Sequence, residues 1–92
     1  MTIDEITRAT CGGDVVQISR DDIETLLDAG ELIRETATGL AGTIRTLRIG
    51  GGIFVQERNP EGDCFLRRLS SEDAAARFID ARTASYERMW DG

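Results

Sequence analysis

Carboxylates are the reactive groups that this sequence concentrates most strongly in one short segment. A concentrated negative field attracts and orients a basic partner, so we predict that these acids bind one. The predicted partner-binding acids are Asp21, Asp22, Glu24 and Asp28. The alternative is a solvated helix face, on which the positive end of the helix dipole favours Asp21 and Asp22.

Two aromatic residues near the end of the chain are predicted to extend this partner-binding surface. Trp90 is the only tryptophan, and Tyr86 stands close to it in the last predicted helix. Aromatic anchors are enriched at protein interfaces. The alternative is that Trp90 closes the bottom of a small core.

Arginine supplies all 11 basic residues, because the sequence contains no lysine. Arginine forks match phosphate, so the second hypothesis is a nucleic-acid-binding or anion-binding module. Its predicted contact residues are Arg45, Arg48, Arg67 and Arg68. The net charge of −6 counts against it. The competing prediction pairs solvent-facing arginines with Glu35, Glu57 and Asp63 across strands.

The sequence lacks the groups that most catalysts use. Without histidine it has neither the commonest general base nor the commonest metal ligand, and without lysine it cannot form a Schiff base. The run Gly50-Gly51-Gly52 precedes a predicted strand and matches no phosphate-binding motif. We therefore predict no catalytic residue, metal or cofactor, and a carboxylate-based enzyme is the third hypothesis.

The cysteine content and the start of the chain predict a cytoplasmic location. Cys11 and Cys64 stand far apart in no CxxC pair, so both are expected to be free thiols, with Cys64 a small core residue. The acidic residues 1–5 do not resemble a signal peptide. No apolar run approaches the roughly 20 residues that span a bilayer, so no membrane partner is expected.

Capping boxes predict the helices that would position these groups. Thr2 with Glu5 begins a short helix that Gly12-Gly13 end, and Ser19 with Asp22 begins a second helix that stops at Gly30. Ser70 followed by Asp73 predicts a long third helix that ends at Met89 or Trp90. Its predicted buried stripe is Ala75, Phe78, Ile79, Arg82, Tyr86 and Met89.

Strand-forming composition covers most of the remaining chain. The predicted strands are 14–19, 31–38, 43–49, 53–58 and 63–69. Residues 39–42 form a predicted turn, and the glycines 50–52 break the chain. The turn Asn59-Pro60-Glu61-Gly62 predicts a β-hairpin.

This order of elements predicts a single α+β domain over residues 1–92, with a small, mainly antiparallel sheet of four or five strands. A short internal helix and a long C-terminal helix are expected, packed on one face. The leading hypothesis is a small, acidic, non-enzymatic protein-protein interaction module. By class analogy with anti-CRISPR and DNA-mimic proteins, it would be an inhibitor or adaptor docking on a basic, nucleic-acid-binding surface. A homodimer is also predicted, because a small sheet leaves edges open.

Overall fold

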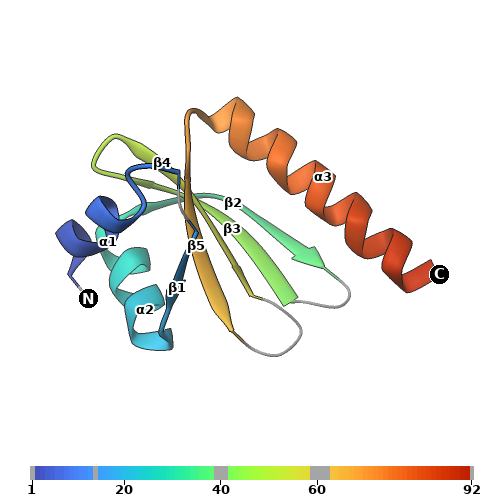
Figure 1. Cartoon of the computed structure of the whole chain (residues 1–92), viewed down its shortest axis with the longest axis horizontal. Helices are drawn as coiled ribbons and strands as arrows, with labels where there is room; N and C mark the ends of the chain where they lie inside the picture. The colour runs from blue at the N-terminus through green and yellow to red at the C-terminus, as the bar shows by residue number, and fades with distance from the viewer. Residues whose placement is uncertain (1, 14, 39–41, 59–62, 92) are drawn as a thin grey trace.

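The described part of the chain forms a five-stranded antiparallel sheet with three helices (Figure 1). The computed structural model describes residues 2–13, 15–38, 42–58 and 63–91, and their side chains except 38, 42 and 86–91. The elements are α1 (Ile3–Ala9), β1 (Val16–Ile18), α2 (Arg20–Ala29), β2 (Glu31–Thr38), β3 (Gly42–Ile49), β4 (Gly52–Arg58), β5 (Cys64–Leu69) and α3 (Glu72–Asp91). The strand order is β1-β5-β4-β3-β2. The predicted α+β class and antiparallel sheet are confirmed.

Both faces of the sheet carry apolar side chains. Successive residues of a strand point to opposite faces, so one strand can contribute to both. In β3, Leu47 and Ile49 join the core cluster of α1 and α2, to which Ile6 and Leu26 belong. Ile44 points the other way and joins the core cluster of α3. The prediction that the helices share one face is therefore wrong: α1 and α2 lie on one face of the sheet and α3 on the other (Figure 1).

The long helix α3 packs against the sheet as predicted. Ala75 and Ile79 are completely buried, and Phe78 packs against the same cluster. The predicted stripe continues to Tyr86 and Met89, whose side chains lie outside the described ones.

The predicted N-cap of α3 is wrong: Ser71, and not Ser70, caps the helix. The Ser71 hydroxyl accepts a hydrogen bond from the Ala74 amide at 3.1 Å, and its carbonyl accepts one from the Ala75 amide at 3.0 Å. The pairing of Leu69 with Ile53 keeps the chain in β5 up to that point, so the helix begins later. No capping box with Asp73 can form from Ser71.

The other two predicted caps are present as capping boxes. The Thr2 hydroxyl accepts from the Glu5 amide at 3.2 Å, and the Ser19 hydroxyl accepts from the Asp22 amide at 3.2 Å. Gly30 ends α2, but its backbone is extended and not left-handed. A Cβ there would lie 2.6 Å from Cγ1 of Ile49, so close packing requires this glycine.

Turn residues connect the strands into hairpins. Gly50 and Gly51 join β3 to β4 with φ of 54° and 83°, the left-handed backbone of a type I′ turn. The predicted turn at 59–62 lies outside the described residues, as do residues 39–41 of the turn at 39–42. The pairing of Arg58 with Cys64 nevertheless confirms the hairpin of β4 and β5.

Candidate functional site

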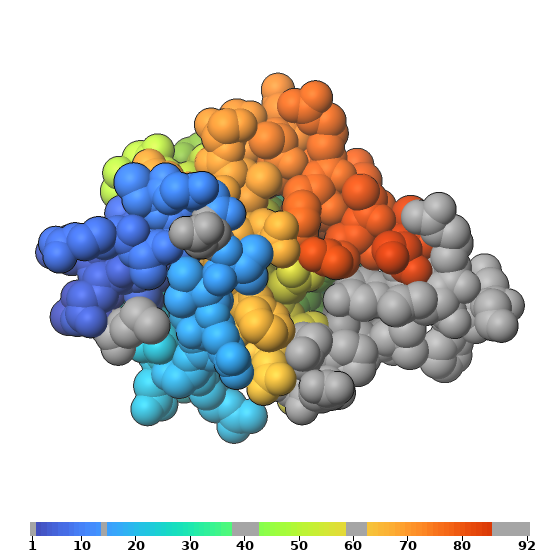
Figure 2. Space-filling model, viewed as in Figure 1, coloured from blue at the N-terminus to red at the C-terminus, as the bar shows by residue number. Residues whose placement is uncertain are grey.

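The exposed face of α2 carries three of the four predicted partner-binding acids. Asp21, Glu24 and Asp28 are exposed, and none of them forms an ion pair with a described residue. Their spacing of three and four residues places them on one side of the helix. Leu27, beside them, is 36% exposed. Figure 2 shows α2 in cyan at the surface of the molecule.

Asp22 does not belong to this exposed face. Its side chain is 7% exposed, and its carboxylate accepts a hydrogen bond from the Ser19 amide at 3.2 Å. Its carboxylate therefore stabilises the start of α2, and the predicted acidic surface is reduced to Asp21, Glu24 and Asp28.

The predicted aromatic anchors both fall in α3, near its C-terminal end. Tyr86 and Trp90 have side chains outside the described ones, so their role stays a prediction. Since α2 and α3 pack on opposite faces of the sheet, these aromatics extend from a different helix layer than the acids.

The four arginines of the alternative hypothesis do not form one surface. Arg45 shares the α2 side of the sheet with Leu47, and Arg68 lies 5.7 Å from the ring of Phe54 on that same side. Arg48 and Arg67 contact residues of α3 on the other side, Arg48 through an ion pair and Arg67 by stacking on a ring.

Most of these arginines already have acidic partners. Arg45 lies 3.3 Å from Glu35, directly across from it in the sheet. Glu35 therefore pairs with an arginine across strands, as the competing prediction expected. Arg48 pairs with Glu31 at 3.3 Å and also with Glu72. These pairs fix strand β2 and helix α3 to β3.

A buried carboxylate lies where α3 crosses the sheet. Glu57 is 7% exposed and lies 3.2 Å from Nε of Arg82 and 3.6 Å from Arg67. It pairs with an arginine across strands as expected, but the pair is partly buried and not solvent-facing. Both guanidinium groups stack on the ring of Phe78, at 4.3 Å for Arg67 and 5.1 Å for Arg82. This arrangement neutralises Glu57 and attaches α3 to β4 and β5.

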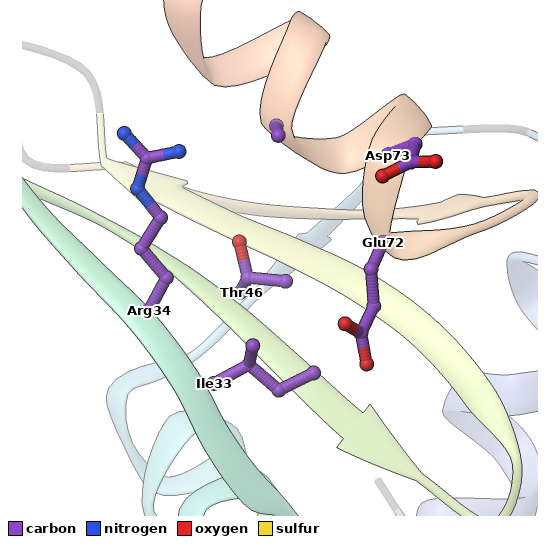
Figure 3. A pocket seen from close by; sticks show the side chains of 6 residues that line it. Ile33, Arg34, Thr46, Glu72 and Asp73 are labelled. Atoms are coloured by element: carbon purple, nitrogen blue, oxygen red, sulfur yellow. The ribbon is translucent and has the colours of Figure 1, made fainter.

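A pocket of about 210 Å³ opens beside the first turn of α3 (Figure 3). Its lining residues are Ile33, Arg34, Thr46, Glu72, Asp73 and Ala76. Arg34 is 3.7 Å from Asp80, and Glu72 pairs with Arg48. Acids in the first turn are also favoured by the helix dipole, so these charges are explained by the attachment of α3.

A larger pocket of about 310 Å³ lies between α2 and strands β3 and β4, and we name it the α2 pocket. Its lining residues are Arg20, Ile23, Glu24, Leu27, Thr43, Arg45, Gln56 and Arg58. Gln56 is 1% exposed, and its Oε1 accepts a hydrogen bond of 2.9 Å from Arg45. Arg20 and Arg58 form no ion pair with a described acid.

Sequence reasoning missed the α2 pocket, although one signal pointed toward it. The alternation of β3 places Arg45 on the same face as Leu47, so an inward arginine could have been expected there. Nothing in the spacing of Arg20, Gln56 and Arg58 indicates that α2 folds back over the ends of two strands.

The described part of the chain can also be examined for a metal site, for the two cysteines and for a membrane-spanning helix. Within it, no three His, Cys, Asp or Glu side chains gather closely enough to hold a metal ion. Cys11 is exposed, and Cys64 is partly buried at the margin of the core. No described helix is both long enough and apolar enough to span a bilayer.

Comparison with known proteins gives no match to a protein-family model, a curated protein or a solved structure. Function must therefore be argued from the chemistry of the surfaces themselves.

Proposed function

We propose that this protein is a non-enzymatic interaction module that docks on a basic surface of a partner protein through the exposed face of α2. The observation that carries the proposal is a set of three acids around the partly exposed Leu27 that form no ion pair with a described residue: Asp21, Glu24 and Asp28. A leucine within a charged rim has the composition of a small docking site.

The acids of the other elements provide the contrast that supports this proposal. Ion pairs with arginine hold five acids of the sheet and of α3: Glu31, Glu35, Glu57, Glu72 and Asp80. The α2 acids lack such partners among the described residues, so their negative charge is not offset by a neighbouring arginine and would attract a basic partner strongly. A nucleic-acid-binding protein surface is the partner class that this chemistry fits best, and inhibition of its binding is the expected consequence.

The test is a pull-down from the native host with wild-type protein and with the triple variant Asp21→Asn, Glu24→Gln and Asp28→Asn. We expect a partner that the wild type retains and the triple variant loses. Asp22 must stay unchanged, because its loss would damage the α2 cap and confuse binding with folding.

A matched control removes three charges elsewhere, at the exposed acids Asp4, Asp73 and Asp80; among the described residues Asp80 has only a long, exposed pair with Arg34, which contributes little to stability. It should retain the partner, because its net charge equals that of the triple variant while its α2 face is intact. Capture of the same proteins by the triple variant and the wild type would refute the proposal.

A further inference from the structure

The α2 pocket collects positive charge in a protein whose net charge is −6. Three guanidinium groups reach it from three elements: Arg20 from α2, Arg45 from β3 and Arg58 from β4. Two of them, Arg20 and Arg58, have no acidic partner among the described residues. Unpaired arginines that converge on a concave site are suited to an anionic ligand.

The third arginine is held in place before any ligand arrives. Arg45 donates from Nη1 to the buried Gln56 at 2.9 Å and from Nε to Glu35 at 3.3 Å. These two hydrogen bonds, made by different nitrogens, therefore restrain the orientation of the Arg45 guanidinium group. Binding to a restrained group costs less conformational entropy than binding to a mobile one.

From this geometry we propose that the α2 pocket binds the phosphate group of a small phosphomonoester. Three arginines and Glu24 give the lining a formal charge of +2, or +1 when Glu35, the partner of Arg45, is counted. This positive charge is opposite in sign to that of a phosphomonoester, which is about −1.5 to −2 near neutral pH. Ile23 and Leu27 line the same pocket and would contact the organic part. A volume of about 310 Å³ is at the small end of ligand sites.

This inference does not rest on the proposed docking function, although both use Glu24 and Leu27. In docking, Glu24 attracts a basic partner, whereas in the pocket it repels phosphate. Neutralising Glu24 should therefore weaken partner binding and strengthen phosphate binding. The two proposals can fail separately.

The experiment follows backbone amide shifts by NMR during titration at constant ionic strength. The probes are propyl phosphate, inorganic phosphate and butyrate, which separate an organic phosphate, free phosphate and a carboxylate. We expect saturable shifts in residues 20–27, 43–45 and 56–58, with propyl phosphate bound most tightly.

Variants then test the named residues. Arg20→Gln and Arg58→Gln should each weaken propyl phosphate binding by about tenfold, as expected for loss of a charge-assisted hydrogen bond, and Glu24→Gln should strengthen it. Arg77→Gln is the matched control, because Arg77 is exposed on α3, and should leave the affinity unchanged. Circular dichroism confirms that each variant is folded.

Two results would overturn the inference. The site is wrong if propyl phosphate gives no saturable shift, or if Arg58→Gln binds it as the wild type does. The ligand class is wrong if inorganic phosphate or butyrate binds as tightly as propyl phosphate.

Discussion

Neighbouring aspartates at the start of α2 have separate roles. Asp22 and Ser19 exchange hydrogen bonds between side chain and backbone, whereas Asp21 is exposed. We expect Ser19→Ala to lower the free energy of unfolding by about 1 kcal/mol, because the cap satisfies an amide that the helix cannot. Urea denaturation followed by circular dichroism measures this change.

Asp21→Asn is the control for the cap, since it changes a neighbouring charge without touching the capping box. It should alter the free energy of unfolding by less than about 0.5 kcal/mol, the range of an exposed charge at a helix end. Equal losses in Ser19→Ala and Asp21→Asn would show that general electrostatics, and not capping, stabilises this helix.

Of the single-residue changes considered, Glu57→Gln is expected to lower the free energy of unfolding most. Glu57→Gln leaves Arg67 and Arg82 without their shared counter-ion while both are still partly buried. We expect a loss of about 2 kcal/mol, below the range for a fully buried pair because both arginines reach solvent.

The matched control for Glu57 is Glu35→Gln, which breaks the more exposed pair with Arg45. Exposed pairs contribute about 1 kcal/mol or less, so this variant should unfold at nearly the wild-type urea concentration. The role given to Glu57 is contradicted if both variants lose the same stability.

Residue identity predicted local partners well but not distant ones. The capping box of Ser19 and Asp22 follows from their spacing of three residues. The pairing of Arg45 with Glu35 follows from the register of β2 and β3. The approach of Arg20 to Arg58 in one pocket depends on how α2 packs over the sheet. Side-chain spacing along one element contains no information about that packing.

At the scale of elements, the hairpin of β3 and β4 depends on two glycines with positive φ. In a type I′ turn, Asn is favoured at the first central position and Gly at the second. We expect Gly50→Asn to keep wild-type stability and Gly51→Ala to lose about 1 kcal/mol, because a Cβ at positive φ is strained. Thermal unfolding of both variants measures the difference.

Gly12→Ala is the control for these substitutions, because Gly12 is exposed and its φ is not positive. It should not lower the melting temperature. A Gly51→Ala protein as stable as Gly12→Ala would mean that the turn relaxes to another type without cost.

The order and type of the elements were predictable because each has a strong local signal. The run Ile53-Phe54-Val55 also indicates a strand buried on both faces, which is how β4 lies between the two helix layers. The start of α3 was not predictable, since Ser70 and Ser71 cap equally well by composition. The pairing of Leu69 with Ile53, which keeps the chain in β5, decides between them.

For the whole molecule, charge separates structural regions from candidate binding regions. Arginine–acid pairs connect the sheet to α3. On the α2 side, Asp21, Glu24 and Asp28 of the helix and Arg20 and Arg58 of the α2 pocket form no ion pair with a described residue. Both the proposed docking face and the proposed phosphate site lie on this side of the protein.

The predicted homodimer depends on the edges of the sheet. Strand β1 has three residues, so the eight-residue β2 is the better edge for pairing with a second copy. A two-fold register centred on Arg34 or Glu35 would place like charges opposite each other, which is unfavourable. A register centred on Thr36 avoids this clash.

We therefore expect light scattering at micromolar concentration to give about twice the chain mass of 10.1 kDa. Thr36→Lys would place two positive charges opposite each other at the two-fold axis and should return the protein to a monomer. Ala84→Lys adds the same charge at an exposed site on α3 and should stay dimeric. A monomeric wild type would exclude the dimer, and a dimeric Thr36→Lys protein would place its interface away from β2.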